Sequence, residues 1–382
     1  MDIKRLNSGV CIDNFRAAGV REGKYGVAIV VNDKICETVG VFTGNNIKAA
    51  PVLLSMKNIK NGFQAIVANS GNANACTVKG MENARRMCDI AGRELGINSE
   101  NIGVASTGII GRELDMLRIE KLIKRAVQNL SKKRSKNAAE AIMTTDTRTK
   151  EISLEYKGIK IGGICKGSGM IAPNLATMLC FLTTNADLSK DTLQKELKDV
   201  VDNSFNMLII DGDMSTNDTV ILMSNRNKKC RLQDFRYILN YACIKFARMM
   251  ATDGEGVTKF MEIEVKNAKT EKDARDGARA IASSPLVNTA IHGENPNWGR
   301  IIAALGSKVK FDFEKTDMVF ESGVKRAVAV KNGKGMNLDS VRKILNNREI
   351  KIIIDIKSGK YGARAFGCDL SQEYIRINSE YN

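Results

Sequence analysis

Residues 166–186 read KGSGMIAPNLATMLCFLTTNA. The stretch begins with the G-x-G-x-x-A spacing of a nucleotide-binding loop, but such a loop opens a helix. Here the glycines are followed by Pro173 and then by the apolar run 178–182, which is typical of a buried strand. We therefore interpret the stretch as a loop that delivers one threonine, Thr177, to the start of a strand.

The Thr177 hydroxyl could act as a nucleophile if a base were available to take its proton. The chain has a single histidine, His292, which disfavours a histidine-based triad and a multi-histidine metal site. If the bond after Ala176 were cut, the new α-amino group of Thr177 could serve as that base, because its ordinary pKa is about 7.7–8.0. The alternative is that Thr177 is an ordinary β-branched residue at a strand start, where threonine is common.

The composition indicates a large globular protein. The chain has 382 residues, enough for one large domain or two of ordinary size, and 43% of them are hydrophobic. No run approaches the roughly 18–20 apolar residues of a membrane helix, and the first residues lack the apolar core of a secretory signal. Nine cysteines without a C-x-x-C pair indicate reduced thiols. We expect a cytoplasmic protein with no membrane partner.

The net charge of +16 raises the question of a nucleic-acid partner. The lysines are, however, spread along the whole chain, and only KKRSK at 132–136 forms a cluster. No aromatic residues are interleaved with this cluster, so we interpret it as a solvated helix end and expect no nucleic-acid partner. A positive field could equally attract small carboxylate substrates.

Apolar periodicity predicts both strands and helices along the chain. The predicted strands are residues 27–31, 65–68, 102–106, 152–156, 159–164, 219–223, 309–313, 350–356 and 374–378. The predicted helices are residues 81–95, 113–133, 188–203, 232–252 and 271–283. Because strands and helices do not alternate strictly, we expect an α/β fold of layered, mixed sheets with helices outside, not a doubly wound parallel sheet.

Two further segments carry residue types that suit a catalytic site. In NIGVASTGIIG, residues 101–111, a strand is predicted to end in Ser106-Thr107-Gly108, where backbone N–H groups would suit an oxyanion hole. The alternative is a turn that needs glycine for its dihedral angles. In MATDGEGVTKF, residues 250–260, Glu255 lies between two glycines and could point its carboxylate at a ligand. The alternative is a solvated glutamate at a helix end.

Two other segments favour structural roles. DGDMSTNDT, residues 211–219, has the alternating oxygen side chains of a calcium loop, but Thr216 stands where glycine is needed and the bidentate glutamate is missing. We therefore expect no metal site, and instead a network of Asp and Asn that packs against the loop of residues 166–186. The only tryptophan, Trp298, lies in a segment of Gly, Asn and Pro, and we expect it to anchor packing.

Taken in order, these segments resemble the glutamate N-acetyltransferase / ornithine acetyltransferase family of arginine biosynthesis, called ArgJ. The resemblance runs nearly from end to end, and long matches in one order are more specific than any single motif. It is carried by FRAAGV (15–20), GVFTGNNIKAAPV (40–52), IVANSGNANACT (66–77), ASTGIIG (105–111), IMTTDT (142–147), KGSGMIAPNLATML (166–179), DGDMSTNDT (211–219), DGEGVTK (253–259) and NPNWGRI (295–301).

The resemblance implies an enzyme that cuts itself between Ala176 and Thr177. The two fragments, residues 1–176 and 177–382, would stay together and pair as a dimer of heterodimers. The implied fold is a layered sandwich of mixed sheets and helices, of the ArgJ and DmpA-like self-processing kind found in certain aminopeptidases. No cofactor is implied, and whether acetyl-CoA can also donate the acetyl group is left open by the sequence.

The resemblance also implies a reaction and a set of site residues. Thr177 would be the nucleophile and its own amine the base, while the acetyl group moves from N2-acetylornithine to Thr177 and then to glutamate. Thr107 and Gly108 match the oxyanion-hole pair of the family. The implied substrate contacts are Thr144 (or its neighbour Thr145), Lys166, Thr177, Glu255 and Asn378.

The C-terminal segment departs from the pattern of the family. Family members usually end in Asn-x-x-Tyr-Thr followed by Thr or Ser, whereas INSEYN keeps Asn378 and Tyr381 and stops at Asn382. Of this pattern, only Asn378 carries over as a substrate contact. The alternative function is an amidase or aminopeptidase of the same fold, in which water takes the acyl group.

Overall fold

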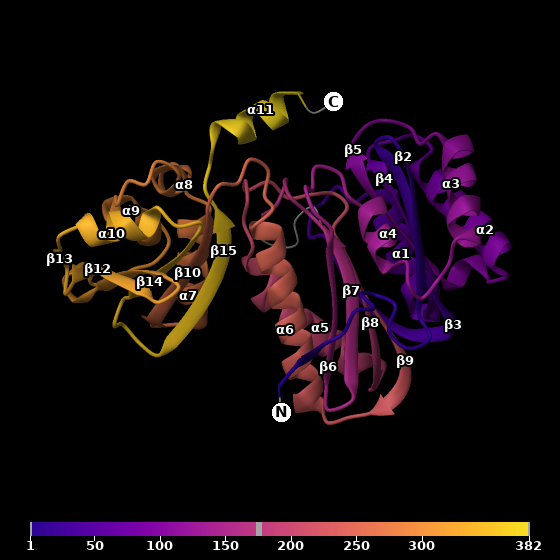
Figure 1. Ribbon diagram of the computed structural model, residues 1–382, viewed down its shortest axis with the longest axis horizontal. Coiled ribbons are helices and arrows are strands. Elements are labelled where there is room, and N and C mark those ends of the chain that lie inside the picture. Colours follow the sequence, from indigo (N-terminus) through magenta and orange to yellow (C-terminus); the bar gives the residue numbers. More distant parts are fainter. Residues whose placement is uncertain (1, 173–177, 381–382) are drawn as a thin grey trace. The chain divides into compact units, whose positions relative to one another are not determined.

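The computed structural model describes residues 2–172 and 178–380, so Ala176, Thr177, Tyr381 and Asn382 lie outside the described residues. The chain forms two compact units (Figure 1). Unit 1 takes three stretches, which end at Gly167, Phe205 and Phe246. Unit 2 takes the stretches that begin at Ser168 and Asn206, and the stretch from Ala247 onward. Among the described residues, no helix is long and apolar enough to cross a lipid bilayer.

Unit 1 is built on nine strands in the order β1-β6-β7-β8-β9-β3-β4-β5, with β2 paired to β3. The pairing is mixed, because β8–β9 and β4–β5 are parallel whereas the other pairs are antiparallel. The strands are β1 (Lys4–Arg5), β2 (Arg16–Glu22), β3 (Tyr25–Phe42), β4 (Phe63–Asn72), β5 (Ile102–Ile109), β6 (Lys150–Tyr156), β7 (Ile159–Lys166), β8 (Leu179–Asp187) and β9 (Thr219–Lys229).

Strand β3 joins two layers of this sheet because it is long and irregular in its middle. Its first half pairs with β2 and β4, its second half pairs with β9, and the register shifts between Val31 and Cys36. Side chains alternate along a strand, so Ala28 and Val30 pack into a core shared with β4, β8 and β9, while Val27 packs into another core. The first core separates the two sheet layers, which therefore form a sandwich.

Helices cover the outer faces of the unit 1 sandwich (Figure 1). Apolar residues of α2 and α3 pack with Val27, Ile29 and Val31 in the second core. On the other side, the Phe246 ring of α6 packs against Gly163 of β7, where a Cβ would stand only 2.9 Å from the ring. The helices and short 3-10 turns are α1 (Ala50–Asn58), η1 (Ile59–Asn61), α2 (Gly80–Leu95), η2 (Ser99–Asn101), α3 (Met116–Gln128), α4 (Ser135–Ala141), α5 (Lys190–Asn203), η3 (Phe205–Met207) and α6 (Leu232–Ala251).

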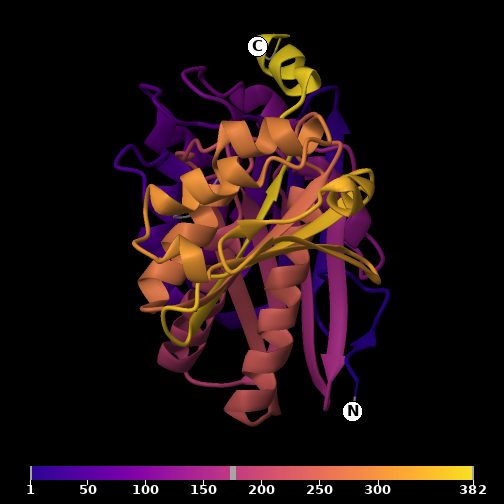
Figure 2. The same ribbon diagram turned by 90° about the vertical axis from the view of Figure 1, so that its left-hand side faces the viewer.

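Unit 2 has a six-stranded sheet in the order β13-β12-β11-β14-β10-β15, which Figure 2 views with its helices. Along β10, Met261, Ile263 and Val265 pack against helices α7 to α10, while Glu262 and Glu264 on the other face form ion pairs. The strands are β10 (Phe260–Ala268), β11 (Asp317–Ser322), β12 (Lys325–Lys331), β13 (Lys334–Gly335), β14 (Glu349–Asp355) and β15 (Tyr361–Cys368). The helices are α7 (Glu271–Ala282), α8 (Pro285–His292), α9 (Trp298–Gly306), η4 (Phe313–Lys315), α10 (Asp339–Leu345) and α11 (Gln372–Glu380).

The expected fold class is confirmed, since both sheets are mixed and layered with helices. The predicted helices 81–95, 188–203, 232–252 and 271–283 correspond to α2, α5, α6 and α7 within two residues. The helix predicted over 113–133 is shorter at both ends. Asp115 caps the start of α3 by accepting from the backbone N–H of Arg118, and past the end of α3 Ser131 pairs with Ala17 of β2. The KKRSK cluster at 132–136 spans the turn after α3 and the first two residues of α4, so it begins a helix and does not end one.

Two strand predictions were wrong. Residues 309–313 follow α9 as a loop that ends in η4, and their alternating pattern arises because Val309, Phe311 and Phe313 each pack onto the unit 2 core. Residues 374–378 lie in α11. The Ser371 hydroxyl accepts from the Tyr374 N–H, which is the bond of a helix N-cap, and this signal outweighs the apparent alternation.

The core of unit 2 can be tested through its strand β14. Ile352 is fully buried in that core, so we expect Ile352→Ala to lower the free energy of unfolding by about 2–5 kcal/mol. Trp298, which stacks on Phe313 with ring centroids 5.8 Å apart, is the only tryptophan and reports on this unit. Urea unfolding followed by tryptophan fluorescence measures the effect. Val324→Ala, at a fully exposed turn position, is the matched control and should change little.

Candidate functional site

The expected oxyanion-hole residues lie at the end of β5, where this strand runs parallel to β4. Thr107 pairs with Ser70, and Gly108 pairs with Gly71. Gly108 has a φ of 129°, and a Cβ at this position would stand 2.4 Å from the carbonyl carbon of Gly71. Both features require glycine, so the strand end holds Gly108 in a backbone conformation that other residues rarely adopt.

Three buried asparagines hold the segment around Thr107 in place. The Asn217 side chain donates to the carbonyl oxygens of Ala73 (2.6 Å) and Ser106 (2.9 Å), which joins the ends of β4 and β5. The Asn69 side chain accepts from the Ser106 hydroxyl at 2.5 Å and donates to the carbonyl of Asn72. The Asn72 side chain donates to the carbonyls of residues 112 and 113. The backbone beside Thr107 is therefore fixed from several directions.

Lys166, at the end of β7, reaches the same place from the other sheet layer. Its side chain is buried, and Nζ donates to Thr107 Oγ1 at 3.3 Å. An ammonium group has no acceptor, so the threonine hydroxyl accepts in this bond and keeps its own proton for donation. The structure thus brings two of the predicted site residues, Thr107 and Lys166, into contact.

A buried carboxylate, Asp146, lies next to this pair. Its Oδ1 accepts from Lys150 Nζ at 2.7 Å and from the Gly167 N–H at 2.8 Å, and its Oδ2 accepts from the Thr144 N–H at 3.1 Å. Burial alone would raise the pKa of Asp146, but the charges of Lys166 and Lys150 and the donated hydrogen bonds lower this pKa to about 2. Asp146 is therefore ionised at neutral pH.

A second buried carboxyl, Asp218, binds the chain just after the expected cleavage site. Its Oδ1 accepts from the Met178 N–H at 3.0 Å, and the Met178 carbonyl accepts from the Thr219 N–H at 3.0 Å. Burial raises the pKa of Asp218 well above its usual range, whereas the pKa of Asp146 is lowered. The residue that follows Thr177 is thus anchored on both its backbone polar groups.

In unit 2, the predicted substrate contacts Glu255 and Asn378 lie together. The Asn378 amide donates to Glu255 Oε2 at 2.8 Å, although the two residues are far apart in sequence. The Glu255 N–H donates to the Ser168 carbonyl at 2.8 Å, and a Cβ at Gly169 would stand only 2.4 Å from the Glu255 carboxylate. Glu255 is therefore held against the glycine loop and is not simply a solvated residue after α6.

The segment of residues 211–219 packs against the glycine loop as predicted. Asp211 Oδ2 accepts from the Met170 N–H at 2.5 Å, and Oδ1 accepts from the Ile171 N–H at 2.8 Å. Both oxygens of the Asp211 carboxylate therefore bind backbone N–H groups of the glycine loop. Among the described residues, no group of three or more His, Cys, Asp or Glu side chains is arranged to hold a metal.

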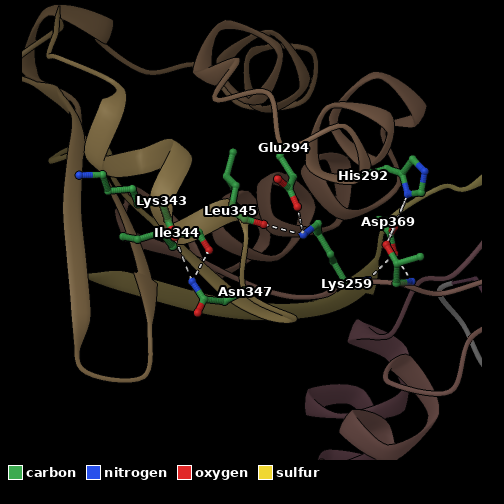
Figure 3. Close-up of polar contacts among 9 residues, drawn as sticks. Lys259, His292, Glu294, Lys343, Ile344, Leu345, Asn347 and Asp369 are labelled. Atoms are coloured by element: carbon green, nitrogen blue, oxygen red, sulfur yellow. Dashed lines mark hydrogen bonds and ion pairs between the residues drawn. The ribbon is translucent and has the colours of Figure 1, made fainter.

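His292, the single histidine, lies beside Asp369 and Thr258 in unit 2 (Figure 3). His292 Nδ1 lies 2.7 Å from Asp369 Oδ2, and the Thr258 hydroxyl donates to the same carboxylate oxygen at 2.5 Å. A catalytic triad needs the carboxylate on one ring nitrogen and the hydroxyl on the other. Here both partners lie at Nδ1, since the Thr258 hydroxyl is 3.4 Å from that atom, so the arrangement does not form a triad.

Sequence reasoning missed several residues of these clusters. It gave no role to Asp146, although Asp146 lies within the quoted motif IMTTDT, nor to Lys150, Asn69 or Asn217. A signal for Lys150 exists, because it shares the β6 face of Ile152 and Leu154 and is therefore buried. Asp146 carried no such signal, since its partners include backbone N–H groups of a distant segment.

The mixed, layered sheets and their helices define a layered α/β protein, as the sequence motifs predict. The ArgJ family model matches residues 14–382, and the chain belongs to the ArgJ family. The glutamate N-acetyltransferase of Methanothermobacter thermautotrophicus is 46% identical, over 100% of this chain and 99% of the relative.

Other relatives agree with this membership. The arginine biosynthesis bifunctional protein ArgJ of Caldanaerobacter subterraneus subsp. tengcongensis is 44% identical, over 95% of this chain and 94% of the relative. Among solved structures, the arginine biosynthesis bifunctional protein ArgJ of Bacillus halodurans is similar, with 34% identity and a TM-score of 0.50. That likeness covers 53% of this chain and 98% of the solved chain.

The buried ion pair of Asp146 and Lys150 gives a testable prediction about stability. Lys150→Met would leave the Asp146 carboxylate buried with fewer partners, so we expect a loss of about 3–5 kcal/mol in the free energy of unfolding, measured by denaturant titration. Lys195→Met is the matched control, because Lys195 and Asp199 are also four residues apart at 2.7 Å but both are exposed. Equal effects of the two substitutions would contradict a special role for the buried pair.

Proposed function

We propose that this ArgJ-family protein is a glutamate N-acetyltransferase that moves the acetyl group of N2-acetyl-L-ornithine to L-glutamate. The observation that carries the proposal is the contact between Lys166 and Thr107, at the end of a strand where Gly108 is required. This contact places a positive charge for a substrate carboxylate beside a hydroxyl suited to a developing oxyanion. The names of the similar proteins support the same reaction.

In the proposed mechanism, Thr177 carries the acetyl group as an ester. The α-amino group of Thr177 takes the hydroxyl proton, and Oγ attacks the acetyl carbonyl carbon of the donor. The carbon–nitrogen bond to ornithine breaks as the proton passes to the leaving amine. Glutamate then attacks the ester with its amine, and the Thr177 hydroxyl is restored. The Nδ1 arrangement of His292, the single imidazole, favours an amine as the base.

The proposed oxyanion hole consists of the Thr107 hydroxyl and the Gly108 N–H. In each half-reaction the carbonyl oxygen becomes negatively charged, and donors fixed before the reaction stabilise this charge most effectively. The asparagines around Ser106 provide such fixation. Lys166, Thr144, Glu255 and Asn378 are the proposed substrate contacts, with Lys166 suited to the α-carboxylate that both substrates carry and Glu255 suited to the ornithine ammonium group.

Self-cleavage would supply the free amine. Thr177 Oγ would attack the Ala176 carbonyl carbon, the peptide nitrogen would leave as the new amine, and water would open the resulting ester. The fragments 1–176 and 177–382 would then share one sheet, because β7 pairs with β8 and β3 pairs with β9. These pairings support the proposal that the fragments stay together after the cut.

Several finer features complete the proposal. The nine cysteines are free thiols, which supports a reducing compartment such as the cytoplasm. We propose a dimer of heterodimers by likeness to the family. Acetyl-CoA is a candidate second donor, because two of the similar proteins reported above are named as bifunctional. An amidase or aminopeptidase of this fold is the competing function, and release of free acetate in place of N-acetylglutamate would favour it.

The role of Thr177 predicts the outcome of one substitution. Wild-type protein should separate under denaturing conditions into two fragments, the second beginning Thr-Met-Leu-Cys. Thr177→Ala should remain one uncut chain without transferase activity, because both the nucleophile and its amine are lost. Intact mass, N-terminal sequencing and N-acetylglutamate formation measure these results. An uncut wild type with full activity would overturn the mechanism.

The proposed oxyanion hole predicts the effect of substitutions at Thr107. Thr107→Val removes the hydroxyl but keeps the shape, so kcat should fall about 10²- to 10³-fold. Thr107→Ser keeps a hydroxyl at the same position and should retain most of the activity. Steady-state kinetics with N2-acetylornithine and glutamate measure both variants. Similar kcat values for the valine and serine variants would remove Thr107 from the oxyanion hole.

A further inference from the structure

We propose that Asp146 is a positioning residue that keeps the Lys166 ammonium group charged and holds both Lys166 and Thr144 in position for the carboxylate end of an amino-acid substrate. This role rests on the proposed acetyl transfer, because Lys166 and Thr144 are substrate contacts only in that reaction. In the proposed mechanism, Asp146 makes no contact with the reacting atoms.

The hydrogen bonds of Asp146 join two separate segments of unit 1. Oδ1 accepts from the N–H of Gly167, the residue directly after Lys166, and Oδ2 accepts from the N–H of Thr144. Each segment thus carries one proposed substrate contact next to the N–H that Asp146 binds. A single side chain therefore sets the separation of two segments that are far apart in sequence, and its own carboxylate is held by Lys150.

Asp146 is also the ionised acid of this cluster. Its charge interacts with Lys166 and Lys150, and both interactions favour the carboxylate form. The other titratable groups nearby are Asp218, Cys165 and Cys243, and burial raises the pKa of each of them. Asp146, whose pKa is lowered, is therefore a negative charge that offsets the burial of Lys166.

The charges of three side chains explain why Lys166 suits an anionic ligand. The ammonium groups of Lys150 and Lys166 both interact with the ionised carboxylate of Asp146. Without Asp146 the two buried ammonium groups would repel each other, and Lys166 would lose its proton more readily. With Asp146, Lys166 keeps the positive charge that an α-carboxylate can bind.

The pH dependence of Asp146→Asn tests this role. The amide keeps the shape and one acceptor but removes the charge, so the pKa of Lys166 should fall. We expect the alkaline limb of the kcat/KM profile for N2-acetylornithine to move to lower pH by about 1 unit or more. KM should rise more than kcat falls, because the reacting atoms of Thr177 are not altered. Asp199→Asn, in an exposed pair on α5, is the matched control and should keep the wild-type profile.

A double variant separates positioning from structural support. Asp146→Asn with Lys150→Met removes both charges of the buried pair, so this double variant should be more stable than Lys150→Met alone. It can therefore be assayed if Asp146→Asn alone does not fold. Because Lys150→Met also removes a positive charge that repels Lys166, the double variant is judged by KM and not by the alkaline limb. KM returns to the wild-type value if Asp146 only supports Lys150, and it stays raised if Asp146 positions Lys166 and Thr144. A wild-type profile and KM in Asp146→Asn, or a wild-type KM in the double variant, would overturn the inference. Absence of acetyl transfer in the wild type would instead overturn the proposed function.

Discussion

The unit 1 site depends on burying the Lys166 ammonium group, because a buried charge is costly unless an opposite charge is buried with it. Asp146 supplies that opposite charge and is held by Lys150 and by two backbone N–H groups. With this compensation, Lys166 can extend from the end of β7 to Thr107 at the end of β5. The two sheet layers of the sandwich meet at this contact, and β3 makes it possible by running from one layer into the other.

The same region combines a fixed backbone with shifted pKa values. Asparagine side chains hold the strand ends around Ser106, and glycine at position 108 allows a close approach to β4. The charges of Lys166 and Lys150 lower the pKa of Asp146, whereas burial raises the pKa of Asp218, whose Oδ1 anchors Met178. Environment, and not residue type, thus assigns these two aspartates different roles.

The sequence predicted the fold class and most long elements, because strands such as β3 and helices such as α2 have strong periodicity. It failed at residues 309–313, where apolar side chains of a loop alternate by packing on the core, and at residues 374–378, where the cap at Ser371 decides for a helix. These failures share a cause: local alternation was interpreted without the tertiary contacts or caps that override it.

The site was predictable only in part. Thr107, Gly108, Lys166 and Glu255 stand in motifs whose residue types suggest their chemistry. The contact of Lys166 with Thr107 and that of Asn378 with Glu255 join residues far apart in the chain, so periodicity could not reveal them. Asp146 was missed for a further reason, since two of its partners are backbone N–H groups that leave no trace in residue type.

The central claim is that a threonine hydroxyl, and not water, receives the acetyl group. The most direct measurement is to mix the protein with N2-acetylornithine in the absence of glutamate, quench the mixture in acid and determine the mass of each fragment. The account predicts that the fragment 177–382 gains the mass of one acetyl group, that the fragment 1–176 gains none, and that added glutamate removes the label as N-acetylglutamate. An unlabelled second fragment in a protein that still forms N-acetylglutamate would contradict it.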